Sequence, residues 1–382
     1  MTKSVLVTGG AGFVGSHLVD ELVARGHRVR VLDRLEPQVH GAGAAAAGFR
    51  PEYLHPDAEL LVGDTGDAEA IARALHGIDV VFHQAAAVGV GQSMYEIERY
   101  VQRNTQATAV LLQAVVDRQA AQPLERLVVA SSMSIYGEGE YRLPDGRSFA
   151  PVPRPDSQLA ERSWEMLGPG GVVAAPVPTT EDKLLQPTSV YALTKRDQEE
   201  YCLVVGAAYG IPTVALRYFN IYGPRQALSN PYTGVAAIFG SCLLNDEAPT
   251  VYEDGLQTRD FIHVSDIVAA NMLALDADAG AVAGQVLNVG TGRPTDLIQL
   301  YAALQKALDV PGIEPTIPGR FRRGDIRHCF ADISRISAAL GYTPAVDLEA
   351  GLKELADWMR TQPAENLTDH AAAELERKGL VH

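Results

Sequence analysis

The segment 5-VLVTGGAGFVGSHLVDEL-22 carries the main signal for the architecture of this chain. A short apolar run leads into a glycine-rich turn, and a helical pattern follows directly. Gly9, Gly12 and Gly15 let such a turn close, let the backbone approach a pyrophosphate, and let the helix pack on the strand. The helix N-terminus then offers free N–H groups and a positive dipole end to phosphates. The segment therefore predicts a dinucleotide site.

The residues after this turn indicate which dinucleotide binds. Asp33 ends the next apolar run, 18 residues after Gly15, where a carboxylate suits the 2′-hydroxyl of an adenosine ribose. Arg34 could pair with a 2′-phosphate, but Asp33 would repel that phosphate, so we expect NAD rather than NADP. Asp64 is expected either to contact adenine or to cap a helix over 65–76. The other predicted cofactor contacts are Gly9, Gly12, Phe13, Val14 and Ala85.

Short apolar runs alternate with helical patterns through the first 130 residues. This alternation predicts β-α-β units with a buried parallel sheet, an α/β fold of the doubly wound Rossmann type. The expected strands are 4–8, 28–33, 59–63, 79–83 and 126–131, with 212–220 and 285–290 joining later. The expected helices include 13–25, 69–76 and a long one over 96–121.

Composition and charge exclude several classes of function. The apolar fraction of 47% and charged fraction of 21% are those of an ordinary globular protein. The net charge of −15 argues against nucleic acid or an anionic membrane as partner. Three scattered Cys indicate neither a disulfide framework nor a metal site, which suits a reducing cytoplasm. The start resembles no signal peptide, and no run is long enough to span a bilayer.

The stretch 189-SVYALTK-195 is the candidate for catalysis. Tyr191 and Lys195 lie one helical turn apart, so an ammonium would favour the phenolate. Thr188 or Ser189 is expected to cap the helix, which puts Tyr191 in its first turn, where the dipole also favours negative charge. Taken alone, the spacing fits a core tyrosine somewhat better than a catalytic one.

Several motifs in a fixed order resemble extended short-chain dehydrogenase/reductases. They are TGGAGFVG (8–15), HQAAA (83–87), SSMSIYG (131–137), YALTK (191–195), LRYFNIYGPRQ (216–226), RDFIHVSD (259–266), NVGTG (288–292) and RRGDIRHCFAD (322–332). The likeness runs from about residue 3 to 361. Within the family it is similar to nucleotide-sugar epimerases, and to the branch acting on dTDP-6-deoxyhexoses such as dTDP-L-rhamnose.

The resemblance implies a seven-stranded parallel sheet, a smaller C-terminal domain for the nucleotide sugar, and a homodimer formed by the 96–121 helix and the helix starting at Tyr191. The NAD-binding domain would span 1–222, with an insertion at 138–187 and a return of the chain at 265–291. The nucleotide-sugar domain would comprise 223–264 and 292–361. Residues 362–382, polar and helix-prone, would form an appendage.

The resemblance also assigns the catalytic roles. Tyr191 would be the base, Ser132 the hydroxyl partner of the reacting oxygen, and Lys195 the residue that holds the nicotinamide ribose and lowers the pKa of Tyr191. Ser131 and Ser134 are close competitors of Ser132. Sugar 4,6-dehydratases of the family carry Asp-Glu where this chain has Met133 and Ser134, so dehydration is not expected.

Arginines are the expected ligands of a nucleotide diphosphate, because guanidinium forks match phosphate oxygens. Motif matching favours Arg259, Asn220 and Arg322 over Arg217 and Arg225. His83 is expected to pack at a strand end. The predicted substrate-binding residues are Ser134, Asn220, Arg225, Arg259 and Arg322.

These features predict an NAD-dependent epimerase that oxidises the sugar at C4, holds the 4-keto sugar, and returns the hydride from the other face. The alternatives are a UDP-hexose or UDP-uronate epimerase, a decarboxylase, a 4-ketosugar reductase, and an NAD(P)-sensing regulator. A regulator has no need of Ser132, Tyr191 and Lys195 together.

The insertion 138–187 is rich in proline and glycine and lacks periodicity, so we expect no regular element in it. It separates Ser132 from Tyr191, which must meet at one sugar oxygen. We therefore expect it to act as a lid that orders over the sugar.

Overall fold

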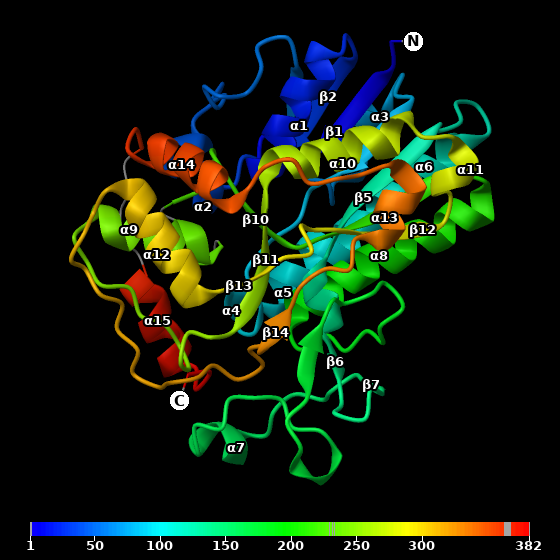
Figure 1. Ribbon diagram of the computed structural model, residues 1–382. Helices are drawn as coiled ribbons and strands as arrows, with labels where there is room; N and C mark the ends of the chain where they lie inside the picture. Colours follow the sequence, from blue (N-terminus) through cyan, green and yellow to red (C-terminus); the bar gives the residue numbers. More distant parts are fainter. Residues whose placement is uncertain (1, 229, 231, 233, 363–367, 382) are drawn as a thin grey trace.

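A seven-stranded parallel sheet forms the centre of the molecule (Figure 1). The computed structural model describes residues 2–228, 230, 232, 234–362 and 368–381. The strand order is β12-β9-β5-β4-β1-β2-β3, and each neighbouring pair is parallel. The strands are β1 (Ser4–Thr8), β2 (Arg28–Asp33), β3 (Glu59–Val62), β4 (Val80–His83), β5 (Arg126–Ser132), β9 (Thr213–Tyr218) and β12 (Gln285–Val289). Each corresponds to a predicted strand, and the predicted doubly wound α/β fold is confirmed.

Helices cover both faces of this sheet because consecutive strand residues point to opposite sides. In β1, Val5 and Val7 belong to the core under α1 (Phe13–Ala24) and α10 (Val264–Asp276). Leu6 between them belongs to the opposite core, under α3 (Ala68–Leu75), α6 (Ala107–Gln119) and α8 (Val190–Tyr209). The sheet is therefore buried on both faces, which explains why its strands read as continuous apolar runs.

The predicted long helix over 96–121 is present as a continuous helical run from Ile97 to Gln119, with a π-helical segment in its middle. Its parts are α5 (Ile97–Tyr100), the π-helical segment (Val101–Gln106) and α6. Asn104 in the π-helical segment is buried, and its side chain needs partners. Its amide donates to Ala87 O at 3.0 Å and Thr194 Oγ1 at 2.9 Å, and its oxygen accepts from Ala87 N. The widened turn thus coincides with a polar residue pointing inward.

A smaller set of elements lies beside the main sheet (Figure 1). Its four-stranded sheet contains β10 (Asn220–Tyr222), β11 (Thr258–His263), β13 (Pro294–Asp296) and β14 (His328–Cys329). A separate core joins α9 (Val235–Leu244), α12 (Leu297–Leu308) and α14 (Leu348–Met359). The shorter helices are α2 (Pro37–His40), α4 (Val90–Ser93), α11 (Ala279–Val282), α13 (Ser334–Leu340) and 3₁₀ turns at Ala42–Ala45, Met133–Tyr136 and Pro169–Gly171.

The insertion 138–187 contains regular structure, so the expectation of an irregular segment is wrong. It forms a three-stranded antiparallel sheet in the order β7-β6-β8, and a short helix. These elements are β6 (Glu140–Arg142), β7 (Ser148–Phe149), β8 (Ala175–Val177) and α7 (Asp156–Ala160). A small apolar core of its own, with Tyr141 at its centre, makes this possible despite weak periodicity. The insertion projects from one end of the molecule (Figure 1).

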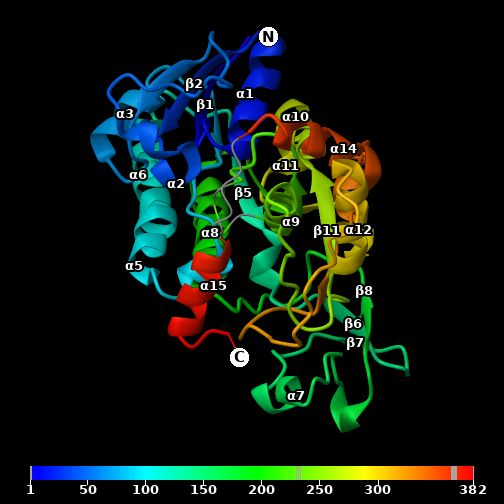
Figure 2. The ribbon, with the colours of Figure 1, turned by 90° about the vertical axis from the view of Figure 1, so that its left-hand side faces the viewer.

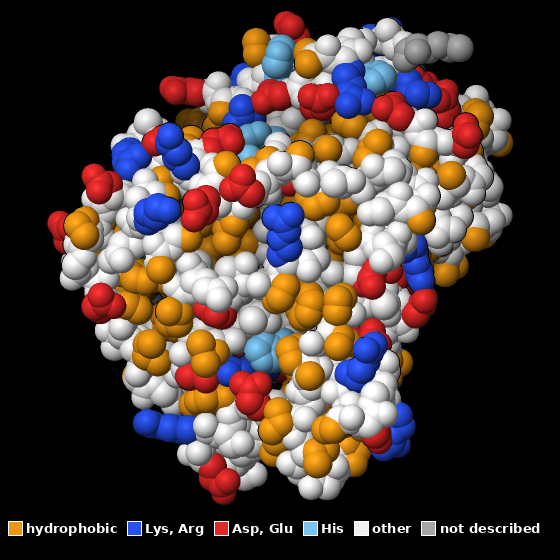
Figure 3. All heavy atoms as spheres, in the orientation of Figure 1, with side chains coloured by type: hydrophobic (Ala, Val, Ile, Leu, Met, Phe, Trp, Pro, Cys, Tyr) orange, Lys and Arg blue, Asp and Glu red, His pale blue; other side chains and the backbone are white. Residues whose placement is uncertain are grey.

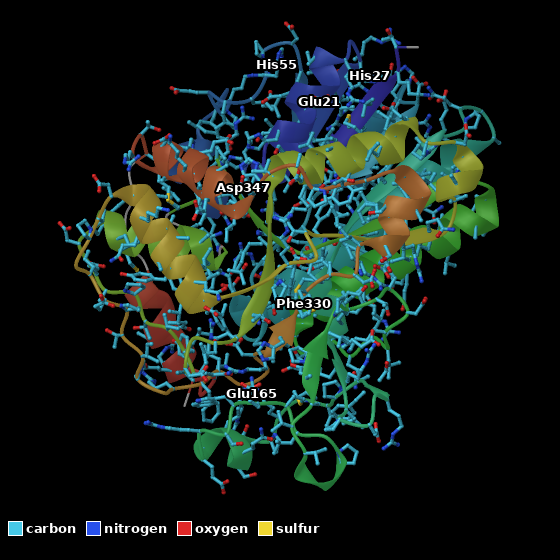
Figure 4. The ribbon with its side chains drawn as sticks, in the orientation of Figure 1. Glu21, His27, His55, Glu165, Phe330 and Asp347 are labelled. Atoms are coloured by element: carbon cyan, nitrogen blue, oxygen red, sulfur yellow. The ribbon has the colours of Figure 1, made fainter. Side chains whose placement is uncertain are left out.

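Buried ion pairs attach the insertion to the smaller set of elements. Arg154 donates to both oxygens of Glu253, at 2.7 and 3.0 Å. Arg327, with 0% of its side chain exposed, donates to Asp254 at 2.6 Å and to Glu165 at 2.6 Å. Figure 4 shows Glu165 between α7 and β14, where the insertion meets the 325–329 segment. Because unpairing buried charges is costly, this junction holds the insertion in one place.

The C-terminal segment docks on the protein through α15 (Thr368–Arg377) and the residues after it (Figure 2). Leu375 is 6% exposed and lies against Gly91. Glu376 pairs with Arg320, and Arg323 N donates to Leu380 O at 3.2 Å. The tail therefore connects α4 with the 320–323 segment.

The surface carries charges of both signs. On the face drawn in Figure 3, acidic and basic side chains are interspersed with apolar ones. Within the described ranges, no helix is long and apolar enough to cross a membrane.

Candidate active site

A cavity of about 480 Å³ lies at the carboxyl ends of the central strands. The strand order reverses between β1 and β4, and ligands of such sheets bind at this reversal. The structure places most of the predicted residues around this one cavity. They are Gly9, Gly12, Phe13, Val14, Gly15, Asp33, Arg34, Asp64, Ala85, Ser132, Ser134, Tyr191, Lys195 and Asn220.

The glycine turn is too tight for side chains. Gly9 has φ +69°, and a Cβ there would lie 2.8 Å from the backbone of Ala85. A Cβ on Gly15 would lie 2.2 Å from Gly9 O. Gly12 caps α1 without a side-chain hydrogen bond, so the first N–H groups of this helix face the cavity unprotected. This geometry fits a dinucleotide pyrophosphate.

Asp33 holds a fixed carboxylate at the end of β2. Its two oxygens accept from Ala11 N at 3.1 Å and from Leu35 N at 2.9 Å, and the residue still lines the cavity. Arg34 donates to Asp64 at 2.7 Å and pairs with Glu36. The guanidinium that might have drawn a 2′-phosphate is thus already paired, which supports the preference for NAD.

Asp64 does not cap the following helix. The N-cap of α3 is Asp67, whose carboxylate accepts from Glu69 N and Ala70 N. Asp64 instead accepts from Gly66 N at 2.8 Å and lines the cavity. The capping alternative is therefore wrong, because the helix begins three residues later than expected.

Tyr191 lies in the first turn of α8, as predicted. Ser189 is the N-cap, and its Oγ accepts from Ala192 N at 3.1 Å. Burial raises the pKa of Tyr191, while a hydrogen bond with Ser132 lowers it. Its ring meets that of Tyr100 edge-on at 6.4 Å. Sequence reasoning missed Tyr100, the last residue of α5, which lies next to the π-helical segment.

Lys195 projects into the same cavity from the next turn. Its ammonium donates to Ala130 O at 2.6 Å and to Gln198 Oε1 at 2.9 Å. Burial lowers the pKa of Lys195 to about 8, while Cys202 and Glu199 act in the opposite direction. Lys195 is not among the groups that shift the pKa of Tyr191 in this structure, so the lowering of that pKa by Lys195 stays a prediction.

The three serines after β5 have different surroundings. Ser132 Oγ accepts from Ser134 N at 3.2 Å and Ser134 Oγ at 2.9 Å. Ser131 also lines the cavity, but its hydroxyl donates to Glu199 at 2.6 Å. Met133 lines the cavity beside Ser132 and has no group that could transfer a proton. The engaged hydroxyl of Ser131 favours Ser132 as the partner of the reacting oxygen, and this role stays a prediction.

Three predicted arginines do not line the cavity. Arg225 pairs with Asp20 at 2.7 Å. Arg259 donates to the carbonyls of Ile326 and Arg327, and Arg322 pairs with Asp325 at 2.9 Å. Their role at a diphosphate stays a prediction that requires each guanidinium to leave its present partner. Arg217 is a buried partner of Glu199.

Two amides at the cavity have an oxygen without a partner. Asn220 Oδ1 and Gln226 Oε1 are buried and make no hydrogen bond, and both residues line the cavity. Beside them, Gly234 begins α9 without a side-chain cap, and Val235 lines the cavity. Gln226 lies at the end of the 216–226 motif, but a glutamine at this position did not by itself indicate a binding residue. These groups suit the polar part of a ligand.

The surroundings of His83 agree with its expected role. His83 is buried at the end of β4, and its ring nitrogens form hydrogen bonds with the hydroxyls of Thr8 and Thr108, as a packed residue would. None of residues 138–187 lines the cavity, so the structure gives no support to the expected lid, which stays a prediction for the sugar-bound protein. The described part of the chain contains no cluster of three or more acidic, His or Cys residues that could hold a metal.

The chain matches the model of the NAD dependent epimerase/dehydratase family over residues 5–160 and 162–290. It is 36% identical to a dTDP-L-rhamnose 4-epimerase of Burkholderia thailandensis, over 94% of this chain and 95% of that protein. A UDP-glucose 4-epimerase of Thermotoga maritima, solved with UDP-glucose, has a TM-score of 0.75 at 30% identity, covering 94% and 98% of the chains. The UDP-glucose 4-epimerase of Thermus thermophilus, solved with NAD, has a TM-score of 0.71 at 29% identity, covering 94% and 100%.

Proposed function

The chain belongs to the NAD dependent epimerase/dehydratase family, and we propose that it inverts C4 of a dTDP-6-deoxyhexose. It is an NAD-dependent nucleotide-sugar epimerase, an isomerase. The 36% identical dTDP-L-rhamnose 4-epimerase supports the choice of sugar. The single observation that carries the proposal is that Ser132, Tyr191 and Lys195 surround one cavity with the glycine turn.

Tyr191, Ser132 and Lys195 have separate roles in the proposed reaction. The glycine turn and Asp33 would hold NAD, which would accept the hydride from the sugar and return it. Tyr191 removes the proton of the C4 hydroxyl as the 4-keto sugar forms and returns it afterwards. Ser132 donates to the same sugar oxygen, and the Lys195 ammonium stabilises the phenolate of Tyr191. Met133 beside Ser132 supplies no acid, so a hexose that does carry a C6 hydroxyl would not be dehydrated here.

A sugar without a carboxylate suits this cavity. Besides Lys195, the cations that line it in the described chain are Arg34, Arg99 and Arg103. Arg34 and Arg103 pair with Glu36, and Arg99 pairs with Glu96. A uronate would need a free cation near the sugar, so a UDP-uronate epimerase or decarboxylase is less well supported.

A UDP-hexose is the second candidate substrate. A putative UDP-glucose 4-epimerase of Methanocaldococcus jannaschii is 29% identical over 93% of this chain. Asn220, Gln226 and the start of α9 would hold the nucleotide diphosphate and sugar of either substrate. The proposed domains are those expected above: 1–222 with 265–291 for NAD, and 223–264 with 292–361 for the nucleotide sugar.

The test is direct incubation with candidate sugars. Purified protein is mixed separately with dTDP-L-rhamnose, UDP-glucose and UDP-glucuronate, and inversion at C4 is followed by proton NMR. We expect inversion of the dTDP sugar without added cofactor, because an epimerase regenerates its NAD. Inversion of UDP-glucose alone would replace the proposed sugar. A requirement for NADPH in every turnover would indicate a reductase.

The protein is also proposed to be a homodimer. Exposed apolar side chains follow the outer faces of α5, the π-helical segment and α8: Ile97, Val101, Leu193, Tyr201 and Val204. Such a patch on adjacent helices suits a self-complementary interface. Val204→Glu is expected to give monomers in light scattering. Because Cys202, Cys242 and Cys329 are buried and form no disulfide, a reducing cytoplasm is the proposed location.

A further inference from the structure

Gln198 contacts the Lys195 ammonium from outside the cavity. It lies on α8 less than one turn after Lys195, and its side chain is 0% exposed. Its amide oxygen accepts from Lys195 Nζ at 2.9 Å. Gln198 is not among the residues that line the cavity, so any influence it has on the reaction passes through Lys195.

The hydrogen bonds of the ammonium leave one direction open. A Lys ammonium has three N–H donors and no acceptor. Ala130 O takes one at 2.6 Å and Gln198 takes the second. Since Lys195 lines the cavity, the third N–H is left for the cofactor and Tyr191.

Gln198 is itself held in one orientation. Its oxygen must face Lys195, because an ammonium only donates. Its nitrogen therefore points to Thr108 Oγ1 at 2.9 Å and to His83 Nε2 at 3.0 Å. His83 Nε2 then accepts, which puts the ring proton on Nδ1, 2.8 Å from Thr8 Oγ1. Burial lowers the pKa of His83 to about 3, so the ring is neutral as this arrangement requires.

We propose that Gln198 is a positioning residue for the reaction, which aims the Lys195 ammonium at the cofactor and Tyr191 and is held in turn by Thr108 and a neutral His83. The proposal rests on the proposed function, since only there does the direction of this ammonium matter. It adds a residue that touches neither substrate nor cofactor.

The other titratable groups around Lys195 are either paired with another residue or held in one protonation state. On α8, Glu199 pairs with Arg217 of β9, and burial raises the pKa of the Cys202 thiol to about 12. Tyr191 lies one turn earlier on α8. His83 on β4 is neutral. A substitution at position 198 therefore changes a direct hydrogen-bond partner of the Lys195 ammonium.

Two substitutions at this position should act in opposite directions. Gln198→Met keeps the length but removes the acceptor, so deprotonation of Lys195 should move down by about one pH unit. Gln198→Glu places a carboxylate on the ammonium, so deprotonation should move up by at least about one pH unit. The high-pH limb of kcat should follow, while the KM for the nucleotide sugar stays unchanged.

Deprotonation of Lys195 can be measured without turnover. Trace acetylation with acetic anhydride between about pH 6 and 11, followed by peptide mass spectrometry, gives the midpoint for the Lys195 peptide. Gln113→Met, on the exposed side of α6, is the matched control and should leave the midpoint in place. Circular dichroism of each variant shows whether it is folded.

Opposite shifts of the labelling midpoint would support the proposal. Shifts in the same direction, or none in a folded Gln198→Glu protein, would overturn it. If no sugar is epimerised by any form while the midpoints still move apart, the contact of Gln198 with Lys195 stands and the proposed function fails. A selective rise in KM would show that Gln198 acts on the substrate instead.

Discussion

Arg217 on β9 and Glu199 on α8 form a buried, two-pronged ion pair, with Nε–Oε2 at 2.9 Å and Nη2–Oε1 at 2.5 Å. Ser131 at the end of β5 donates to the same carboxylate at 2.6 Å. Glu199 follows Lys195 by one helical turn. The pair thus ties two central strands to the helix that carries Tyr191 and Lys195.

Arg217→Met is expected to destabilise the protein by about 3–5 kcal/mol, because it leaves the Glu199 carboxylate buried without its cation. Urea unfolding followed by circular dichroism measures the loss. The control is Arg196→Met, which breaks an exposed pair with Glu200 on the same helix and should cost less than about 1 kcal/mol. Equal losses in the two variants would contradict the importance of burial.

Tyr191→Phe is expected to abolish epimerisation while leaving NAD bound, because it removes only the proton acceptor. Turnover by NMR and cofactor content by absorbance check the two parts. Tyr209→Phe, at an exposed position of α8 outside the proposed dimer interface, is the control and should retain full activity. If Tyr191→Phe kept more than about a tenth of the rate, another group would be the base.

Asn220→Ala is expected to raise the KM for the nucleotide sugar about threefold to tenfold, the value of one neutral hydrogen bond. Its buried oxygen has no partner within the protein and lines the cavity. Gln257 also has an unpaired buried oxygen but lies outside the cavity, so Gln257→Ala should leave KM unchanged. A parallel loss of NAD binding would indicate a folding defect in Asn220→Ala.

The insertion 138–187 is expected to behave as a fixed attachment. Hydrogen exchange should show protection rising in 220–228 and 234–236 on addition of dTDP, with no change in 138–187. Arg327→Met should raise exchange throughout the insertion, because it removes the cation shared by Asp254 and Glu165. Protection of 138–187 by dTDP would contradict this and would support the lid over the sugar.

Lys195 makes a pH-dependent contribution to stability. Its folded pKa of about 8 lies below the unfolded value of 10.5, so below about pH 8 both states are charged and burial costs about 3 kcal/mol. Between about pH 8 and 10.5 the unfolded state binds more protons, so stability rises with pH. The free energy of unfolding of the parent should therefore rise by about 2 kcal/mol relative to that of Lys195→Met between about pH 7 and 9.5. Urea unfolding at both values checks this, and an unchanged difference would contradict it.

Local patterns were enough to predict the central sheet, the glycine turn and the cap of α8. Strands 4–8 and 28–33 are apolar because both faces are covered, and glycine at 15 is required by contacts with Gly9 and Gly10, a few residues away. Ser189 before Tyr191 acts within one helical turn. Such signals lie within the pattern of neighbouring residues, so they can be read without knowing the rest of the fold.

The partners of long and buried side chains depended on the assembled fold. Arg259 and Arg225 carry motif-like sequences, yet their guanidiniums reach partners that are distant in sequence, Ile326 O and Asp20. Residue types alone do not reveal that Gln198 joins Lys195 to His83, or that the insertion docks through Arg327. A flexible side chain selects among all groups within its reach, and that set exists only once the chain has folded.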